Sequence, residues 1–120
     1  MSTIPQRKII IRRSLRQLEL HEDNKLIAVY PCAVGKSSTP TPLGSFAIAT
    51  KIMNPGGAFG TRWLGLTLPE YGIHGTNKPA SIGTQASLGC IRMHNHHVEA
   101  LYDLVGVGTP VIIIDRKSVV

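Results

Sequence analysis

The chain has one segment with the spacing of an amphipathic helix, and this restricts the fold more than any other feature of the sequence. Apolar residues recur on one helical face between residues 96 and 105, and Gly106 follows this segment. Asn95 stands directly before it, and we expect its side chain to cap the helix. The other apolar segments are short and bounded by turn residues, which is typical of strands. The sequence therefore predicts a mostly β domain with one α-helix.

The expected strands begin with an antiparallel meander. Three strand segments follow one another in the first half of the chain, and Glu22, Asp23 and Asn24 supply turn chemistry before the third. A fully apolar segment near the C-terminus suits a central strand. We therefore expect a mixed, mainly antiparallel, β-sandwich-like domain. The expected strands cover residues 8–12, 16–21, 25–34, 45–51, 63–68, 73–75 and 111–114.

Length and composition indicate one globular domain over residues 1–120. Hydrophobic residues make up 42% of the chain and charged residues 17%, which fits neither a disordered chain nor a membrane protein. No apolar run approaches the roughly 18 residues of a membrane span, and the N-terminus has no signal-peptide core. We expect no membrane span. The sequence does not fix the oligomeric state, and we expect a monomer.

The charge balance favours an anionic partner or surface. Thirteen Lys and Arg against seven Asp and Glu give a net charge of +6. Aromatic residues make up only 5% of the chain, which is few for a protein that stacks single-stranded bases. We therefore expect no nucleic-acid partner and favour an anionic polymer or a solvated basic face.

The two cysteines stand in different surroundings. Cys32 lies in the apolar segment 26–34, where a thiol serves packing most often. Cys90 lies in the sequence S-L-G-C-I-R-M at residues 87–93, where packing alone explains little. One disulfide is possible, but two cysteines at this length do not indicate a disulfide scaffold.

Cys90 and His74 are the leading candidates for a nucleophile and its base. A cysteine nucleophile needs a base, hydrogen-bond donors for the oxyanion and a group that orients the base. His74 precedes Cys90 by sixteen residues, and the loop-like segment between them allows a turn back. Gly89 permits close approach of the backbone, and the amides of Leu88, Gly89 and Cys90 could converge on a carbonyl oxygen. A buried thiol and a satisfied core histidine are the simpler alternative.

The group that orients His74 is not fixed by the sequence. Residues 71–98 contain no Asp or Glu, so a backbone carbonyl, the amide of Asn77 or Asn95, or a remote carboxylate must serve. The same absence argues against a glycosidase, which needs two carboxylates. Arg92 faces the same side as Cys90 if the segment is extended, where it suits a substrate carboxylate or shapes the loop.

A zinc site is the alternative that the histidines suggest. His94, His96 and His97 could join His74 and Cys90 around one ion. The second paired cysteine of structural zinc sites is missing, however, and adjacent histidines at a helix start rarely converge on one ion. We expect no metal and regard the cluster as a helix N-terminus at the surface.

Three motifs together resemble a known family. I-H-G-T at residues 73–76, followed by S-L-G-C-I-R-M at residues 87–93, is similar to the signature of L,D-transpeptidases with the YkuD-type catalytic domain. T-P-L-G-S-F at residues 41–46 also matches, and the usual order of elements in the family covers essentially the whole chain. The motifs are specific in this combination and at this spacing.

The resemblance implies an enzyme that acts on the stem peptides of bacterial peptidoglycan without a cofactor. Cys90 would attack the bond between the diamino acid and the terminal D-alanine of a tetrapeptide and form a thioester. A diamino-acid amine of a neighbouring stem would then take the acyl group in a 3-to-3 cross-link, whereas water would give carboxypeptidase activity. A non-catalytic wall-binding module is the alternative from another class. The family implies a location in the cell wall, and the missing signal peptide leaves a spore-associated or cytoplasmic protein open.

The resemblance also implies roles for single residues. Cys90 would be the nucleophile, His74 the base, Arg92 the arginine of the motif, and the Gly75 carbonyl would orient the imidazole. We expect Arg92 and Lys78 to supply positive charge to a thiolate held by imidazolium.

The loop and the groove complete the expected site. Ser87 would brace the loop, and the amides of Leu88, Gly89 and Cys90 would hold the oxyanion. Many members carry His where Leu88 stands, so only a backbone role is expected for Leu88. Residues 52–62 would form a short flap over an open groove. The residues expected to contact substrate are Trp63, Tyr71, Thr76 and Asn77.

Overall fold

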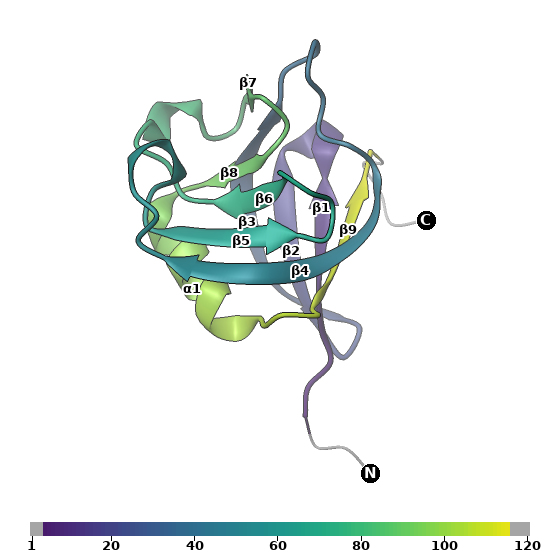
Figure 1. Ribbon diagram of the computed structural model, residues 1–120. Coiled ribbons are helices and arrows are strands. Elements are labelled where there is room, and N and C mark those ends of the chain that lie inside the picture. The colour runs from purple at the N-terminus through teal and green to yellow at the C-terminus, as the bar shows by residue number, and fades with distance from the viewer. Residues whose placement is uncertain (1–3, 116–120) are drawn as a thin grey trace.

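The computed structural model describes residues 4–115, which form a nine-stranded sheet and one α-helix (Figure 1). The helix is α1 (Asn95–Leu104), and three short 3-10 turns are η1 (Arg13–Leu15), η2 (Gly57–Phe59) and η3 (Pro79–Ser81). The strands are β1 (Arg7–Arg12), β2 (Gln17–Glu22), β3 (Lys25–Gly35), β4 (Gly44–Met53), β5 (Arg62–Leu66), β6 (Gly72–His74), β7 (Gln85–Ser87), β8 (Ile91–Met93) and β9 (Pro110–Ile114).

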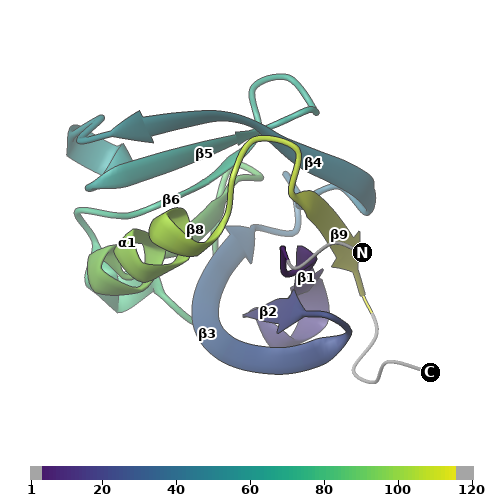
Figure 2. The same ribbon diagram turned by 90° about the horizontal axis from the view of Figure 1, so that it is seen from below.

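The strands close into a ring, which is a more closed arrangement than the expected sandwich-like one. The order is β2, β1, β9, β4, β5, β6, β8 and β3, and β3 pairs again with β2. The long strand β3 joins the two halves because it pairs with β2 along its first residues and with β8 at Cys32 and Ala33. Figure 2 shows how strongly β3 curves to do so. The fold class is confirmed as mostly β with one helix.

Most pairings are antiparallel, and the predicted meander is present. β1 pairs with β2, and β2 with β3, both antiparallel. β9 lies between β1 and β4 and is therefore a central strand, as its apolar sequence predicts. Parallel pairing occurs at β1–β9, β6–β8 and β3–β7.

Alternating apolar residues of the strands fill the core. Ile9, Ile11, Leu18 and Leu20 are fully buried, because every second side chain of β1 and β2 points into the ring. Burial of such side chains stabilises the fold by roughly 1.5–3 kcal/mol each. Cys32 is also buried and unpaired, as expected for a packing residue, and burial raises the pKa of its thiol to about 12.

Several element boundaries differ from the sequence prediction. Arg16 adopts a left-handed conformation with φ 51° after η1, so β2 begins one residue later than expected. β4 extends to Met53 and takes in the first two residues of the expected flap. The prediction that Asn95 caps α1 is wrong, because Asn95 is the first helical residue and His94 occupies the cap position without a side-chain cap.

The helix packs against β5 and β6 through Val98 and Leu101. Within residues 4–115, no helix has the length and apolar character needed to cross a membrane.

Candidate active site

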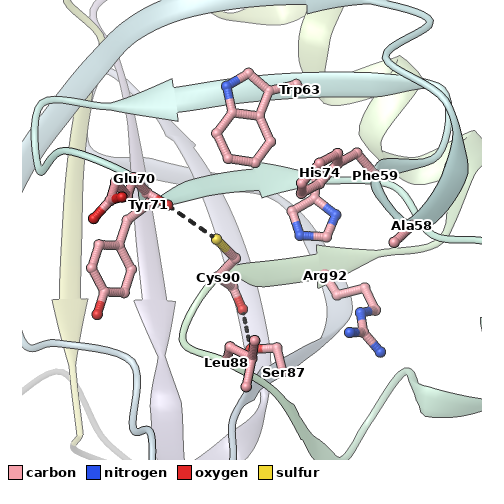
Figure 3. A pocket seen from close by; sticks show the side chains of 10 residues that line it. All are labelled: Ala58, Phe59, Trp63, Glu70, Tyr71, His74, Ser87, Leu88, Cys90 and Arg92. Carbon is pink, nitrogen blue, oxygen red and sulfur yellow. Dashed lines mark hydrogen bonds between the residues drawn. The ribbon is translucent and has the colours of Figure 1, made fainter.

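One cavity of about 480 Å³ holds both candidate catalytic side chains (Figure 3). It lies where β5, β6 and β8 meet the segments before β6 and β8, and it brings together residues that are far apart in the sequence. Residues 58 and 59 of the expected flap also line it. The predicted site residues that line it are Trp63, Tyr71, His74, Ser87, Leu88, Cys90 and Arg92.

His74 is buried and held as one tautomer. Its Nδ1 lies 2.6 Å from the carbonyl oxygen of Gly75, and a carbonyl oxygen only accepts hydrogen bonds. Nδ1 therefore carries the proton in the neutral ring, and Nε2 keeps a free lone pair. The Trp63 ring stacks on the imidazole at 5.6 Å between centroids, and Phe59 approaches it edge-on at 5.1 Å.

Burial lowers the pKa of His74. The hydrogen bond with the Gly75 carbonyl opposes this effect, and the positive charge of Arg92 adds to it. The imidazole is therefore neutral at rest near neutral pH, in the form that can accept a proton.

Cys90 lies in the short segment between β7 and β8. Its Sγ lies 3.7 Å from the carbonyl oxygen of Glu70, and Figure 3 shows the thiol pointing toward Glu70 rather than toward the imidazole. Burial raises the pKa of Cys90, although a backbone hydrogen bond from Gly72 and the charge of Arg92 act in the opposite direction.

The expected thiolate–imidazolium pair is disfavoured in the resting site. Burial opposes the charged form of both groups, because it raises the pKa of Cys90 and lowers the pKa of His74. Arg92 does act on the Cys90 pKa as expected, but Lys78 is exposed and is not among the groups that shift it.

Two buried side chains hold Gly89, the residue before the cysteine. The Gly89 N–H donates to Ser87 Oγ at 3.0 Å, and Ser87 Oγ donates to the Cys90 carbonyl at 2.6 Å. On the other side, Thr41 Oγ1 donates to the Gly89 carbonyl at 2.8 Å and accepts from the Gly35 N–H at 2.9 Å. Ser87 therefore braces the loop together with Thr41.

The glycine itself is required by this geometry. Gly89 has a φ of +129°, and a Cβ there would lie 2.6 Å from the Tyr71 ring. Its N–H is occupied by Ser87, whereas the amides of Leu88 and Cys90 donate to no group within residues 4–115. These two amides are the donors that remain for an oxyanion.

Arg92 lies on β8 beside His74 of β6. Its Nη1 donates to Ser81 Oγ at 2.9 Å, and its buried Nε has no partner within the described chain. Cys90 and Arg92 both line the cavity, as alternation along an extended segment predicts. Arg92 thus adds a positive charge to the lining of the cavity that holds the thiol.

Of the groups that the sequence left open for orienting His74, the Gly75 carbonyl makes the contact. Asn77 is exposed, and Asn95 hydrogen-bonds to the backbone of Thr61 and Thr76 instead of the imidazole. Thr76 is buried away from the cavity, and its hydroxyl accepts from the backbone of Lys78.

The three other histidines of the candidate zinc site form a separate cluster. The rings of His94, His96 and His97 lie 4.1–5.7 Å apart between centroids, and His97 also contacts Tyr30. Among residues 4–115, no group of three or more His, Cys, Asp or Glu side chains is arranged to hold a metal ion.

Sequence reasoning missed four residues around the site. Phe59 gave a usable signal, because it is the single aromatic residue in the flexible segment N-P-G-G-A-F-G. Thr41 was noticed only as part of a motif. Asn95 was noticed as a helix cap and as one of the amides that could orient His74, but its contacts with the Thr61 and Thr76 backbone were not foreseen. Glu70 gave no signal, because its backbone carbonyl rather than its side chain contacts the thiol.

The sequence matches known proteins over most of its length. The model of the YkuD L,D-transpeptidase catalytic domain family matches residues 6–113. A putative L,D-transpeptidase YkuD from Bacillus licheniformis is 51% identical over 111 residues, which are 92% of this chain and 67% of the relative. Its counterpart from Bacillus subtilis is 50% identical over the same shares.

Solved structures share the fold. An L,D-transpeptidase from Mycobacterium smegmatis superposes with a TM-score of 0.81 at 20% identity, over 92% of this chain and 59% of the other. The LdtMt1 L,D-transpeptidase in complex with imipenem gives 0.79 at 20% identity, again over 92% and 59%. The catalytic domain of the Enterococcus faecium L,D-transpeptidase gives 0.78 at 22% identity, over 94% of this chain and all of that domain. The chain thus spans about three fifths of the first two of these proteins.

Proposed function

The chain belongs to the family of L,D-transpeptidase catalytic domains, and we propose that it is a cysteine acyltransferase that acts on the stem peptides of peptidoglycan. The observation that carries this proposal is the presence of a half-buried thiol and a neutral imidazole of fixed tautomer in one cavity. We propose the cell wall as its place of action, because peptidoglycan, the polymer on which this family is expected to act, is found there.

In the first half of the reaction, His74 acts as the base. The thiol of Cys90 turns from the Glu70 carbonyl toward Nε2 of His74 and gives up its proton as Sγ attacks the substrate carbonyl. That carbonyl joins the diamino acid to the terminal D-alanine. The negative charge on its oxygen is held by the amides of Leu88 and Cys90. The imidazolium then protonates the leaving amine, D-alanine departs and a thioester remains.

In the second half, His74 works in the opposite direction. The side-chain amine of a diamino acid on another stem attacks the thioester and gives its proton to Nε2. The tetrahedral intermediate expels the Cys90 thiolate, which is reprotonated by the imidazolium. The product is a 3-to-3 cross-link; water in place of the amine gives carboxypeptidase activity.

The lining of the cavity supports a peptide substrate with carboxylates. Trp63, Phe59 and Tyr71 supply apolar surface for the acyl chain, and Arg92 supplies a positive charge that suits a carboxylate. The net charge of +6 favours an anionic polymer as the larger partner.

The test is intact-protein mass spectrometry after incubation with imipenem. We expect one adduct on the unsubstituted protein and none on Cys90→Ala. Cys32→Ala is the matched control, because Cys32 is the other thiol and is fully buried in the core, and it should keep the adduct. Adduct formation that survives Cys90→Ala would contradict the proposal.

Muropeptides then decide the acceptor. Incubation of the protein with disaccharide tetrapeptides should release D-alanine and give cross-linked dimers, which liquid chromatography resolves from tripeptide products. Tripeptides without dimers would indicate a carboxypeptidase. Sedimentation with purified sacculi without turnover, unchanged in Cys90→Ala, would indicate a wall-binding module.

A further inference from the structure

Asn95 makes a two-point contact with the backbone beside His74. Its Oδ1 accepts from the Thr76 N–H at 3.0 Å, and its Nδ2 donates to the Thr76 carbonyl at 3.0 Å. Oδ1 also accepts from the Thr61 N–H at 3.2 Å. Because backbone N–H groups only donate, the atom that faces both of them must be the amide oxygen.

The peptide unit between Gly75 and Thr76 connects this contact to the imidazole. The Thr76 N–H and the Gly75 carbonyl belong to the same planar trans unit, so they point in opposite directions. One end donates to Asn95 Oδ1, and the other accepts from His74 Nδ1. Asn95, the peptide unit and the imidazole therefore form one continuous chain of hydrogen bonds.

We propose that Asn95 is a positioning residue that orients and polarises the imidazole of His74 through the Gly75–Thr76 peptide unit. The inference rests on the proposed function, because it assigns His74 the role of base. It also identifies a group that orients His74 where no Asp or Glu is close in the sequence. The amide oxygen of Asn95 acts on the histidine indirectly, through the peptide unit between them.

Two physical effects follow from this arrangement. The hydrogen bond from the Thr76 N–H to Asn95 restrains rotation of the Gly75–Thr76 unit, and the hydrogen bond to the Thr76 carbonyl holds the next unit, so the Gly75 carbonyl keeps its direction toward Nδ1. A peptide whose N–H is hydrogen-bonded also has a more negative carbonyl oxygen, because successive hydrogen bonds polarise one another. The more negative oxygen stabilises imidazolium and offsets part of the cost of charging a buried ring.

Neighbouring glycines indicate that this close approach is built into the backbone. A Cβ on Gly75 would collide with Asn95 Oδ1 and lie 3.1 Å from the backbone N of Thr61. A Cβ on Gly60 would collide with the same oxygen and with the Thr76 N. The glycine after the catalytic histidine is therefore needed so that Asn95 can reach the peptide unit.

The charged groups around His74 define what else can move its pKa. Arg92 and Cys90 line the cavity with it, and Glu70 lies at the cavity edge beyond the thiol. Glu99 on α1 accepts a hydrogen bond from Thr61 Oγ1 at 2.7 Å and, among the described residues, shares none with Thr76. Trp63 and Phe59, which cover the ring, carry no charge.

Imidazole ¹⁵N NMR on Asn95→Ala tests the inference, with the resonance assigned by its loss in His74→Gln. We expect the Nδ1–H tautomer to lose its dominance and the pKa of His74 to fall by roughly 0.3 pH unit or more. A purely structural role of Asn95 would lower thermal stability without moving either quantity. Asn95→Ser is measured in parallel in case Asn95→Ala fails to fold, because serine suits a helix start but is too short to pair with Thr76.

Thr61→Val is the matched control. It removes the other side-chain link between α1 and this segment, the bond from Thr61 to Glu99, and leaves the Thr76 contacts in place. We expect the His74 tautomer and pKa to stay unchanged. Asn95→Asp keeps an oxygen that accepts from the Thr76 N–H and should keep the Nδ1–H tautomer.

Acylation by imipenem gives a second readout. Because Asn95 does not line the cavity, the maximal acylation rate should fall roughly tenfold in Asn95→Ala while the half-saturating concentration stays the same. An unchanged tautomer, pKa and acylation rate in folded Asn95→Ala or Asn95→Ser would overturn the inference. Failure of the unsubstituted protein to be acylated would refute the proposed function instead, and the tautomer measurement would still decide the role of Asn95.

Discussion

Replacing Thr41 with valine exchanges the side-chain hydroxyl for a methyl group and leaves the size of the side chain nearly unchanged. Thr41 is 1% exposed, and its hydroxyl satisfies the Gly35 N–H and the Gly89 carbonyl at the same time. Each buried backbone group left without a partner costs roughly 1–3 kcal/mol, so for two groups we expect a loss of about 2–6 kcal/mol in the free energy of unfolding. With a dependence on urea of about 2 kcal/mol/M, the midpoint should fall by about 1–3 M.

The same substitution should slow acylation of the thiol. The Gly89 carbonyl and the Cys90 N–H belong to one peptide unit, so loss of the Thr41 contact frees the amide that is proposed to hold the oxyanion. Loss of a whole oxyanion donor slows catalysis by roughly 10²–10³, and we expect about a tenfold fall for a donor that is only misdirected.

Urea denaturation followed by fluorescence of the single tryptophan measures the first effect, and mass spectrometry with imipenem measures the second. Thr41→Ser is the control, because it keeps the hydroxyl and should cost only about 1 kcal/mol for the lost methyl group. Equal midpoints and acylation rates for Thr41→Val and the unsubstituted protein would refute the reasoning.

Three further predictions concern the loop, the thiol and a buried ion pair. Gly89→Ala should lower the free energy of unfolding by about 2 kcal/mol or more in urea denaturation, because a side chain at φ +129° is strained and meets Tyr71; an unchanged midpoint would contradict this. Since the pKa of Cys90 is raised above its usual 9.0, its alkylation rate by iodoacetamide should still rise with pH above 9, and a plateau below pH 8 would count against it. Burial raises the pKa of Glu19, but the hydrogen bonds from Arg12 and His21 outweigh it, so the net pKa is lowered. The Glu19 contribution to stability should therefore be present above pH 4.5 and be lost as the pH falls through the lowered pKa. Glu19→Gln should remove this part of the acid dependence and, by leaving Arg12 buried without a charged partner, cost roughly 3–5 kcal/mol at pH 7 in urea denaturation.

Residue patterns within short segments predicted the strands and the helix well. They did not predict that the strands pair into a closed ring. The meander of β1, β2 and β3 and the central position of β9 follow from residue patterns within short segments. Closure into a ring depends on the curvature of β3 and its second pairing with β8, sixty residues further along the chain. Periodicity carries no information on such a distant partner, so a sandwich and a closed ring look alike in the sequence.

The predicted family is confirmed, and the motif residues of the candidate site meet in one cavity. His74 and Cys90 were identified because a histidine and a cysteine in motifs at this spacing are specific. Burial disfavours the charge state that was expected for this pair, and the sequence displays the positive residues around the pair but not this burial. Desolvation is a property of the packed site and not of the composition of a loop.

Asn95 shows a different limit of prediction from sequence. Its position before the helical pattern favoured a cap on α1, but its side chain does not cap this helix. An Asn before an apolar helical pattern is most often a cap, because its short side chain reaches the first free N–H groups of the helix. Here the helix begins at Asn95, and the side chain turns outward to free N–H groups of two other segments, at Thr61 and Thr76. As in a cap, the Asn95 oxygen accepts from backbone N–H groups, but these belong to the flap and to the segment after His74 instead of the helix. Only the tertiary structure shows which backbone segments supply the donors.

Two peptide units lie closest to the proposed reaction. In each, one polar group is directed toward the site, and the other is hydrogen-bonded to a side chain that does not line the cavity. The Gly75–Thr76 unit is held by Asn95, and the Gly89–Cys90 unit is held by Thr41, which is 48 residues away in the sequence. The carbonyl and the N–H of a planar trans peptide unit point in opposite directions, so a hydrogen bond that fixes one of them also fixes the direction of the other. In the proposed roles, the orientation of the base and of the oxyanion donor is set by two neutral hydrogen bonds, one half-buried and one buried. These bonds do not titrate, so the geometry of the site should stay constant over the pH range in which His74 and Cys90 change their charge.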